Sequence, residues 1–223
     1  MTAGWYGKLP ALGDFAQRRL EQDFIVGWDT WLQSVIVDSQ RILGGNWLSA
    51  YLRAPVWRFV LAPGVVDSRN WSGILLPSVD RVGRYFPLTV CAPLPQFSWS
   101  APQVAILDAW LNRLEDAARA CLTHEATVEG FEAALAATGT LDLGPPSPGG
   151  AALAALRSRS RACTLPRSPG QAPAFDRLAG DALNELLGGY SLWWDSDGQQ
   201  ALAHSHLPSG PAFVDMLQTT PPA

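Results

Sequence analysis

Apolar residues recur at helical spacing in the first long segment of the chain. From about Gln22 to Leu43 the large apolar side chains fall three or four residues apart, which is the repeat of one helix face. They are Phe24, Trp28, Trp31, Leu32, Val35, Ile36 and Leu43. Gly44 and Gly45 follow, and glycine is common after a helix because it accepts a left-handed backbone. The pattern predicts one long helix that buries a tryptophan-rich face.

Three short apolar runs come next, and each predicts a β-strand. The runs are Trp57–Leu61, Trp71–Leu76 and Leu88–Ala92, stopped by Pro63, Pro77 and Pro93 respectively. Their apolar residues are nearly continuous and do not alternate with polar ones, which is typical of a sheet covered on both faces. We therefore expect helices on each side of these strands.

Helical spacing returns in the second half of the chain. Helices are predicted over about Pro102–Leu122, Val128–Ala137, Phe175–Leu187 and Phe213–Leu217, with Thr127 as the N-cap of the second. A hairpin is predicted from Ser191–Trp194 and Gln199–His206 across an Asp- and Gly-containing turn. Because strands and helices interleave, the predicted class is α/β: a mixed central sheet with helices on both faces, in a single compact domain over residues 1–223.

A stretch rich in proline, glycine and serine interrupts this pattern at about residues 143–171. Such a composition provides little apolar area to offset the entropy of ordering the chain, so we expect a flexible insertion. It also contains four arginines, Arg157, Arg159, Arg161 and Arg167. We interpret these as a solvated loop face in preference to a docking patch.

Charge and cysteine content narrow the classes of function. Sixteen Lys and Arg stand against 20 Asp and Glu, a formal net charge of −4, which is unlike the basic field of a nucleic-acid-binding protein. The three cysteines, Cys91, Cys121 and Cys163, have no paired spacing, and reduced thiols are expected. Neither a secretory signal nor an apolar run of about 18 residues is visible. We expect a soluble cytoplasmic protein that does not insert into membranes.

The familiar catalytic motifs are missing from the sequence. It contains no Gly-x-Ser-x-Gly elbow, Walker loop, Cys-x-x-Cys or His-Glu-x-x-His. His204 and His206 share one face of a predicted strand, but zinc requires three or four ligands and the companions are not evident. We interpret them as an ordinary surface pair, and predict no catalytic residue, metal or cofactor.

The segment Pro77–Pro87 carries the most polarity that the fold does not explain. It joins two apolar strands and contains Asp80, Arg81 and Arg84. Loops on a rigid sheet often carry function, so these charges either contact a partner or pair among themselves in a structural crossover. Asp14 also has two alternative roles: it either caps a turn or is the carboxylate of a pocket.

Trp193 and Trp194 differ from the remaining tryptophans, most of which fit the helical and strand periods of a core. Adjacent residues on a strand point to opposite faces. One of the two can therefore be buried while the other is presented to a partner, a role in which tryptophan is enriched.

Five blocks of the sequence carry a family resemblance. They are Gly4–Pro10 with Gly13–Phe15, Trp28–Leu32, Tyr51–Phe59 with Pro63–Gly64, Pro77–Thr89, and Ser191–Trp194 with Leu207–Pro208. Together they resemble the TagF family of proteins associated with bacterial type VI secretion, and Pro77–Thr89 is the most specific of them. The stretch Thr138–Pro173 has no motif that can be placed.

The resemblance implies a post-translational repressor of type VI secretion that binds the forkhead-associated scaffold protein of the apparatus. Some relatives are fused to a PP2C-type phosphatase domain, but its metal-binding aspartates are not recognisable here, so that activity is not carried over. The expected function is regulatory binding without catalysis. Candidate partner-binding residues are Asp14, Asp80, Arg81, Arg84, Trp193 and Trp194. The alternative is a small-ligand-binding or hydrolase-like enzyme with a site around Asp14, Asp80, Arg81 and Arg84.

Limited proteolysis tests the predicted insertion. A trace of a broad-specificity protease should cut first between about residues 143 and 171, because little buried apolar area holds that stretch. Both flanking pieces should remain associated on gel filtration. Early cuts between Trp57 and Pro93 would contradict the prediction.

Overall fold

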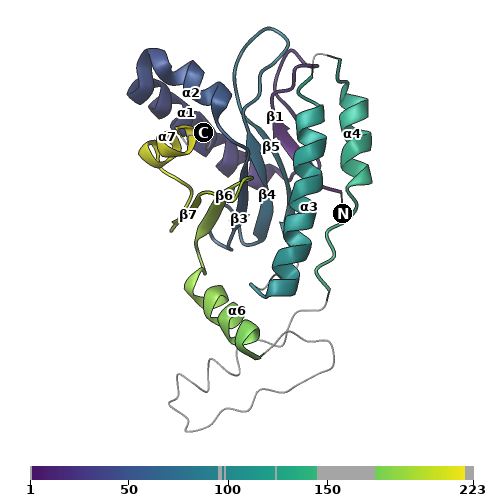
Figure 1. Cartoon of the computed structure of the whole chain (residues 1–223). Helices are drawn as coiled ribbons and strands as arrows, with labels where there is room; N and C mark the ends of the chain where they lie inside the picture. Colours follow the sequence, from purple (N-terminus) through teal and green to yellow (C-terminus); the bar gives the residue numbers. More distant parts are fainter. Residues whose placement is uncertain (1, 95–96, 98, 124, 145–173, 219–223) are drawn as a thin grey trace.

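The computed structural model describes residues 2–94, 97, 99–123, 125–144 and 174–218. The predicted insertion at about 143–171 falls almost wholly outside these residues. Its four arginines and Cys163 lie entirely outside the described residues. The described residues form an α/β fold around one central sheet, as the sequence predicts (Figure 1).

Seven strands form that sheet, in the order β2-β1-β5-β4-β3-β6-β7. Their bounds are β1 Gly4–Gly7, β2 Ala16–Arg18, β3 Trp57–Leu61, β4 Asn70–Leu76, β5 Leu88–Leu94, β6 Ser191–Asp195 and β7 Ala201–His204. Every neighbouring pair runs antiparallel, where the sequence analysis expected mixed directions. Nearly continuous apolar strands indicate that both faces are covered, and that condition does not determine strand direction.

Helices cover both faces of the sheet, as predicted (Figure 1). One layer contains α1 (Gln22–Leu43), α2 (Trp47–Arg53) and α7 (Gly210–Leu217). The other contains α3 (Ala101–Ala120) and α4 (Val128–Ala137). A 3₁₀ turn at Gly44–Asn46 joins α1 to α2, and α6 (Ala174–Leu186) leads into β6.

Elements with a strong local signal have the predicted bounds. The predictions for α1, α4 and β3 match residue for residue, and the Oγ1 of Thr127 accepts the N–H of Gly130 at 3.0 Å as an N-cap should. The predicted stop of β5 at Pro93 is wrong, because the strand continues to Leu94. β1 pairs with β5 only at Thr89, Val90 and Cys91. Pro93 lies beyond these pairs, so its missing N–H removes no hydrogen bond between β5 and β1.

Trp28 anchors the long helix to the sheet. Its side chain is fully buried, and its indole N–H donates to the Oγ1 of Thr89 in β5 at 2.8 Å. Its ring lies 5.1 Å from the ring of Phe59 and 6.1 Å from that of Trp193, centroid to centroid. Aromatic rings bury about 150–250 Å² each and need a partner for any buried N–H. This contact therefore supplies both apolar burial and a satisfied polar group.

Replacing this anchor tests the packing of α1. Trp28→Ala should lower the free energy of unfolding by about 3–5 kcal/mol in urea, the range for a large aromatic removed from a core. Val37→Ala is the matched control on the same helix, because Val37 is 63% exposed, and should change stability by less than about 0.5 kcal/mol. A loss under about 1 kcal/mol for Trp28→Ala would mean that this face does not pack as described.

Candidate functional site

The polar segment Pro77–Pro87, here called the β4–β5 loop, folds as a tight, self-bonded turn. The N–H of Asp80 donates to the carbonyl of Arg84 at 3.1 Å, and the N–H of Gly83 donates to the carbonyl of Asp80 at 3.0 Å. Gly83 has φ +88°, a conformation that glycine adopts without strain. At the base, Phe86 donates its N–H to the carbonyl of Ser78 at 3.1 Å. These bonds give the loop one defined shape.

The carboxylate of Asp80 is buried at the centre of this turn, and its side chain has 0% exposure. One oxygen accepts the Nζ of Lys8 at 3.0 Å and the Nε of Arg84 at 2.7 Å. The other accepts the backbone N–H groups of Val82 at 3.0 Å and Arg84 at 2.9 Å. Four donors from within the chain therefore occupy both carboxylate oxygens.

Opposing effects act on the acidity of Asp80. Burial alone raises the pKa of a carboxyl group, because it disfavours the charged form. The hydrogen bonds from the backbone and side chain of Arg84, from Lys8 and from Val82 outweigh burial and hold the pKa of Asp80 well below its usual range. The group is therefore an ionised structural carboxylate at neutral pH.

Further contacts fasten the loop to the N-terminal strand and to α2. The Oγ of Ser78 donates to the carbonyl of Lys8 at 2.6 Å, and the hydroxyl of Tyr51 donates to the carbonyl of Ser78 at 2.9 Å. Burial is the largest cause that raises the pKa of Tyr51, so the hydroxyl keeps its proton. The N–H of Arg81 donates to the carbonyl of Leu12 at 2.8 Å. Three parts of the chain thus meet under the loop.

Above this buried base lies an exposed surface, here called the loop surface, made by Asp14, Phe15, Arg81, Val82 and Arg84. Val82 is 65% exposed and Phe15 44%, and the side chain of Arg84 is 55% exposed. The guanidinium of Arg84 also donates to the carbonyl of Gly13. Asp14 and Phe15 belong to the segment after β1, and the other three residues belong to the β4–β5 loop, so this bond joins the two halves of the surface.

Phe15 shields the ion pair beneath the surface. Its ring lies 4.7 Å from the ring of Phe86 in an edge-on arrangement and 6.1 Å from that of Tyr6, centroid to centroid. The Nζ of Lys8 lies 4.9 Å from the centroid of the Phe15 ring, within range of a cation–π interaction. The exposed ring of Phe15 thus lies over the buried ammonium group of Lys8.

The predicted site residues separate into three groups. Asp14, Arg81 and Arg84 lie together on the loop surface, and the backbone N–H of Phe15 donates to the carboxylate of Asp14 at 2.8 Å. Asp80 and Trp193 are buried, at 3% and 0% exposure, so in this structure neither side chain faces a partner directly. Trp194 is half-buried and packs against the core cluster on the α3 side of the sheet.

Sequence reasoning did not assign Lys8 to the site. The signal was a lone cation directly after the opening strand Gly4–Gly7, where burial demands an opposite charge. Its partner lies far along the chain, so spacing alone does not identify it.

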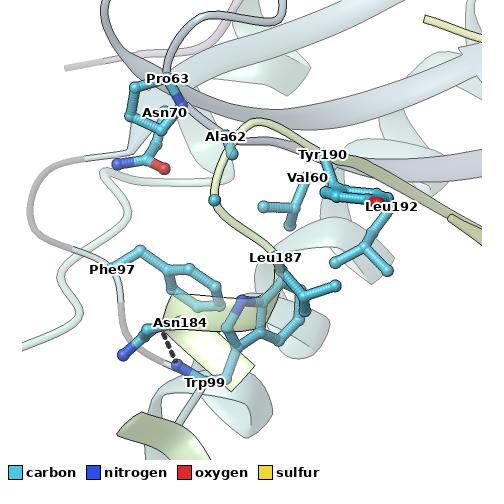
Figure 2. Close-up of a pocket in the computed structure, with 11 residues that line it drawn as sticks. Val60, Ala62, Pro63, Asn70, Phe97, Trp99, Asn184, Leu187, Tyr190 and Leu192 are labelled. Carbon is cyan, nitrogen blue, oxygen red and sulfur yellow. Dashed lines mark hydrogen bonds between the residues drawn. The ribbon is translucent and has the colours of Figure 1, made fainter. Parts of the chain in front are cut away.

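The side chain of Asp80 is fully buried, and one pocket among the described residues lies in another part of the fold. Figure 2 shows that pocket, of about 230 Å³, between β3, β4, β6 and the end of α6. Polar and apolar groups both line it, and the N–H of Trp99 donates to the Oδ1 of Asn184 at 3.2 Å. The lining residues are Val60, Ala62, Pro63, Asn70, Phe97, Trp99, Asn184, Leu187, Gly188, Tyr190 and Leu192.

Two further features concern metals and membranes. Among the described residues, no three His, Cys, Asp or Glu side chains are grouped so as to hold a metal ion. None of the helices that the structure describes is long and apolar enough to cross a bilayer.

Comparison with known proteins points to one family. A family model described as the TagF N-terminal domain, type VI secretion system-associated, matches residues 4–138. Among solved structures, the crystal structure of PA0076 from Pseudomonas aeruginosa PAO1 matches with a TM-score of 0.75 and 35% sequence identity. That match covers 100% of this chain and 98% of the other. No curated protein matches the chain. The residues matched by the family model include the whole loop surface.

Asp80→Asn tests the buried ion pair of Lys8 and Asp80. At neutral pH it should lower the melting temperature clearly, because the Lys8 ammonium, 6% exposed, loses its counter-charge in a buried site. Asp14→Asn, which removes an exposed carboxylate from the same surface, should change stability by less than about 0.5 kcal/mol.

The pH profile supplies the second half of this test. A carboxyl group whose folded pKa is depressed stabilises the fold fully above its unfolded pKa of about 3.9, and this contribution is lost as pH falls toward the folded value. Wild type should therefore lose stability below about pH 4 more steeply than Asp80→Asn. If the stability of the two proteins changed with pH in parallel, Asp80 would not stabilise the fold as an ionised carboxylate.

Proposed function

The chain belongs to the TagF family of type VI secretion-associated proteins, and we propose that it is a post-translational negative regulator of that secretion system. In this proposal it acts in the cytoplasm and binds the forkhead-associated scaffold protein of the apparatus. Binding keeps the scaffold from promoting assembly, and no covalent chemistry is involved.

The observation that supports this proposal is the charged loop surface, whose loop is held by internal hydrogen bonds and a buried ion pair. Arg81 is exposed and the side chain of Arg84 is 55% exposed, although the guanidinium of Arg84 also bonds to Asp80 and Gly13. The buried Lys8–Asp80 pair holds their loop from beneath. Arginine is enriched at protein interfaces because its planar guanidinium makes several directed hydrogen bonds. A surface that is already ordered loses little conformational entropy on binding. Phe15 and Val82 add apolar area between the charges.

The enzymatic alternative depends on the same residues and is less well supported. A general base or nucleophile must reach the substrate with a free lone pair. In Asp80, internal donors occupy both oxygens, and the side chain has 0% exposure. Asp14 is exposed in a turn and accepts the N–H of its neighbour. The arrangement favours a braced contact surface over a reaction centre.

Arginine substitutions on the loop surface test the proposal. Arg81→Ala should weaken binding of the purified scaffold protein by about 2–5 kcal/mol, the range for one partner of a desolvated charge pair across an interface. Arg84→Ala should act in the same direction and release repression with its circular dichroism spectrum unchanged, because Lys8 still balances Asp80. Titration calorimetry measures the binding.

Arg41→Ala is the control for these variants. Arg41 is an exposed arginine of α1, away from the loop surface, with 73% side-chain exposure, and its removal should leave scaffold binding within about twofold of wild type. Normal binding and full repression by a well-folded Arg81→Ala, Arg84→Ala double variant would exclude the loop surface as the contact. Absence of binding by wild type would exclude the proposed partner itself.

A further inference from the structure

The two edges of the sheet differ in how they are protected. At one edge, β2 has only three residues, carries Arg18, and is followed by Arg19 at φ +59°, where the chain turns away. Short length, charge and a local turn are the usual means by which an edge strand avoids pairing with another chain. In the part of the chain that the structure describes, the opposite end of the sheet order is β7 (Figure 1). This strand, Ala201–His204, is also short, with four residues, but it contains neither a proline nor an arginine, lysine or acidic residue.

The register shows which backbone groups of β7 face outward. The N–H of Asp195 donates to the carbonyl of Gln200 at 3.2 Å, and the antiparallel register continues through Trp193↔Leu202 to Ser191↔His204. Hydrogen-bonded and non-bonded pairs alternate along such a ladder. The N–H and C=O groups of Leu202 and His204 therefore point to β6. Those of Ala201 and Ala203 point away from β6, toward the side on which no further strand pairs among the described residues.

An apolar floor lies beside this edge, here called the β6–β7 shelf and made by Leu192, Trp194, Ala201 and Ala203. These four side chains share one face because Trp194 is opposite Ala201 and Leu192 is opposite Ala203. The two alanines are exposed, and Leu192 and Trp194 are half-buried. Leu192 also lines the pocket of Figure 2, so the floor continues into that hollow. Small residues at the rim leave room for larger side chains of an added strand.

We propose that the β7 edge binds an extended segment of a partner protein by strand addition, with alternate apolar side chains of that segment on the β6–β7 shelf. The outward N–H and C=O groups of Ala201 and Ala203 are complementary to extended backbone, and alternate side chains of an added strand fall on one face. The inference rests on the proposed function, because the partner is the scaffold protein. It adds a second contact, distinct from the loop surface.

A second copy of this chain fits the edge less well. Two-fold pairing of β7 with itself would use only the outward N–H and C=O groups of Ala201 and Ala203 from each copy. Stable dimers typically bury about 800 Å² per partner. A segment of another protein gains the same ladder bonds and also covers the shelf and the pocket mouth.

Overlapping 12-residue peptides that span the scaffold protein provide the probe, and proline substitution tests the edge. Ala203→Pro removes one outward N–H and leaves the bonds between β6 and β7 in place, since proline is tolerated where the missing donor faced solvent. Ala203→Ser keeps the N–H and is the matched control. One peptide should bind wild type and Ala203→Ser equally, and Ala203→Pro at least about tenfold more weakly.

N-methylated versions of the same peptide test the ladder on the unmodified protein. Methyl groups on backbone nitrogens of one parity should abolish binding, and those of the other parity should be tolerated, because alternate N–H groups of an added strand face β7. This pattern does not depend on how Ala203→Pro folds.

Each outcome has a distinct meaning. Binding of the full scaffold protein with no peptide bound, equal peptide binding by Ala203→Pro, or tolerance of methylation at both parities would overturn strand addition while leaving the proposed function intact. A chain that sediments as a dimer in wild type and Ala203→Ser, but as a monomer in Ala203→Pro, would assign the edge to a second copy. Failure of wild type to bind the scaffold at all would exclude the proposed function and this inference with it.

Discussion

The buried ion pair of Lys8 and Asp80 is the interaction on which the candidate site depends. A carboxylate and an ammonium group inside a protein lose their hydration, and they persist there only when paired and hydrogen-bonded. Asp80 meets that condition with four donors, and Lys8 meets it with Asp80 and the ring of Phe15. The pair joins the end of β1 to the β4–β5 loop. Arg81 and Arg84 are exposed above that junction.

The sheet provides the rigid body that carries this junction. Each face of the sheet has its own apolar cluster, with Trp28 and Phe59 on the α1 side, and Val60 and Leu111 on the α3 side. Because β3, β4 and β5 are buried on both faces, the loop between β4 and β5 begins and ends on fixed positions. Residues of the loops and sheet edges can then contact a partner while the packing of the core stays unchanged.

The sequence predicts the long elements well, because their signals are local. Helical spacing, the cap at Thr127 and the apolar run Trp57–Leu61 each lie within a few residues, and α1, α4 and β3 have the predicted bounds. β2 and α2 were not predicted, since three and seven residues are too few to show a period. Strand direction was not predictable either, because burial on both faces fits parallel and antiparallel sheets.

The candidate site was predictable only in part. Composition and resemblance both indicated the β4–β5 loop, and alternation on a strand separated Trp193 from Trp194, of which the first is fully buried. The sequence left open whether the charges of this loop pair internally or face outward. The structure divides them: Asp80 pairs internally with Lys8 and Arg84, and the side chain of Arg84 also remains 55% exposed. That division depends on a lysine distant in sequence, which local patterns do not reveal.

We propose that the protein represses type VI secretion after the apparatus proteins have been made. The most direct test is to overproduce the chain in its host bacterium. A secreted type VI substrate is then measured in the medium, and the apparatus proteins are measured in the cells. The account predicts that the secreted substrate falls while the cellular level of the apparatus proteins is unchanged. Undiminished secretion, or a fall that follows loss of the apparatus proteins, would contradict it.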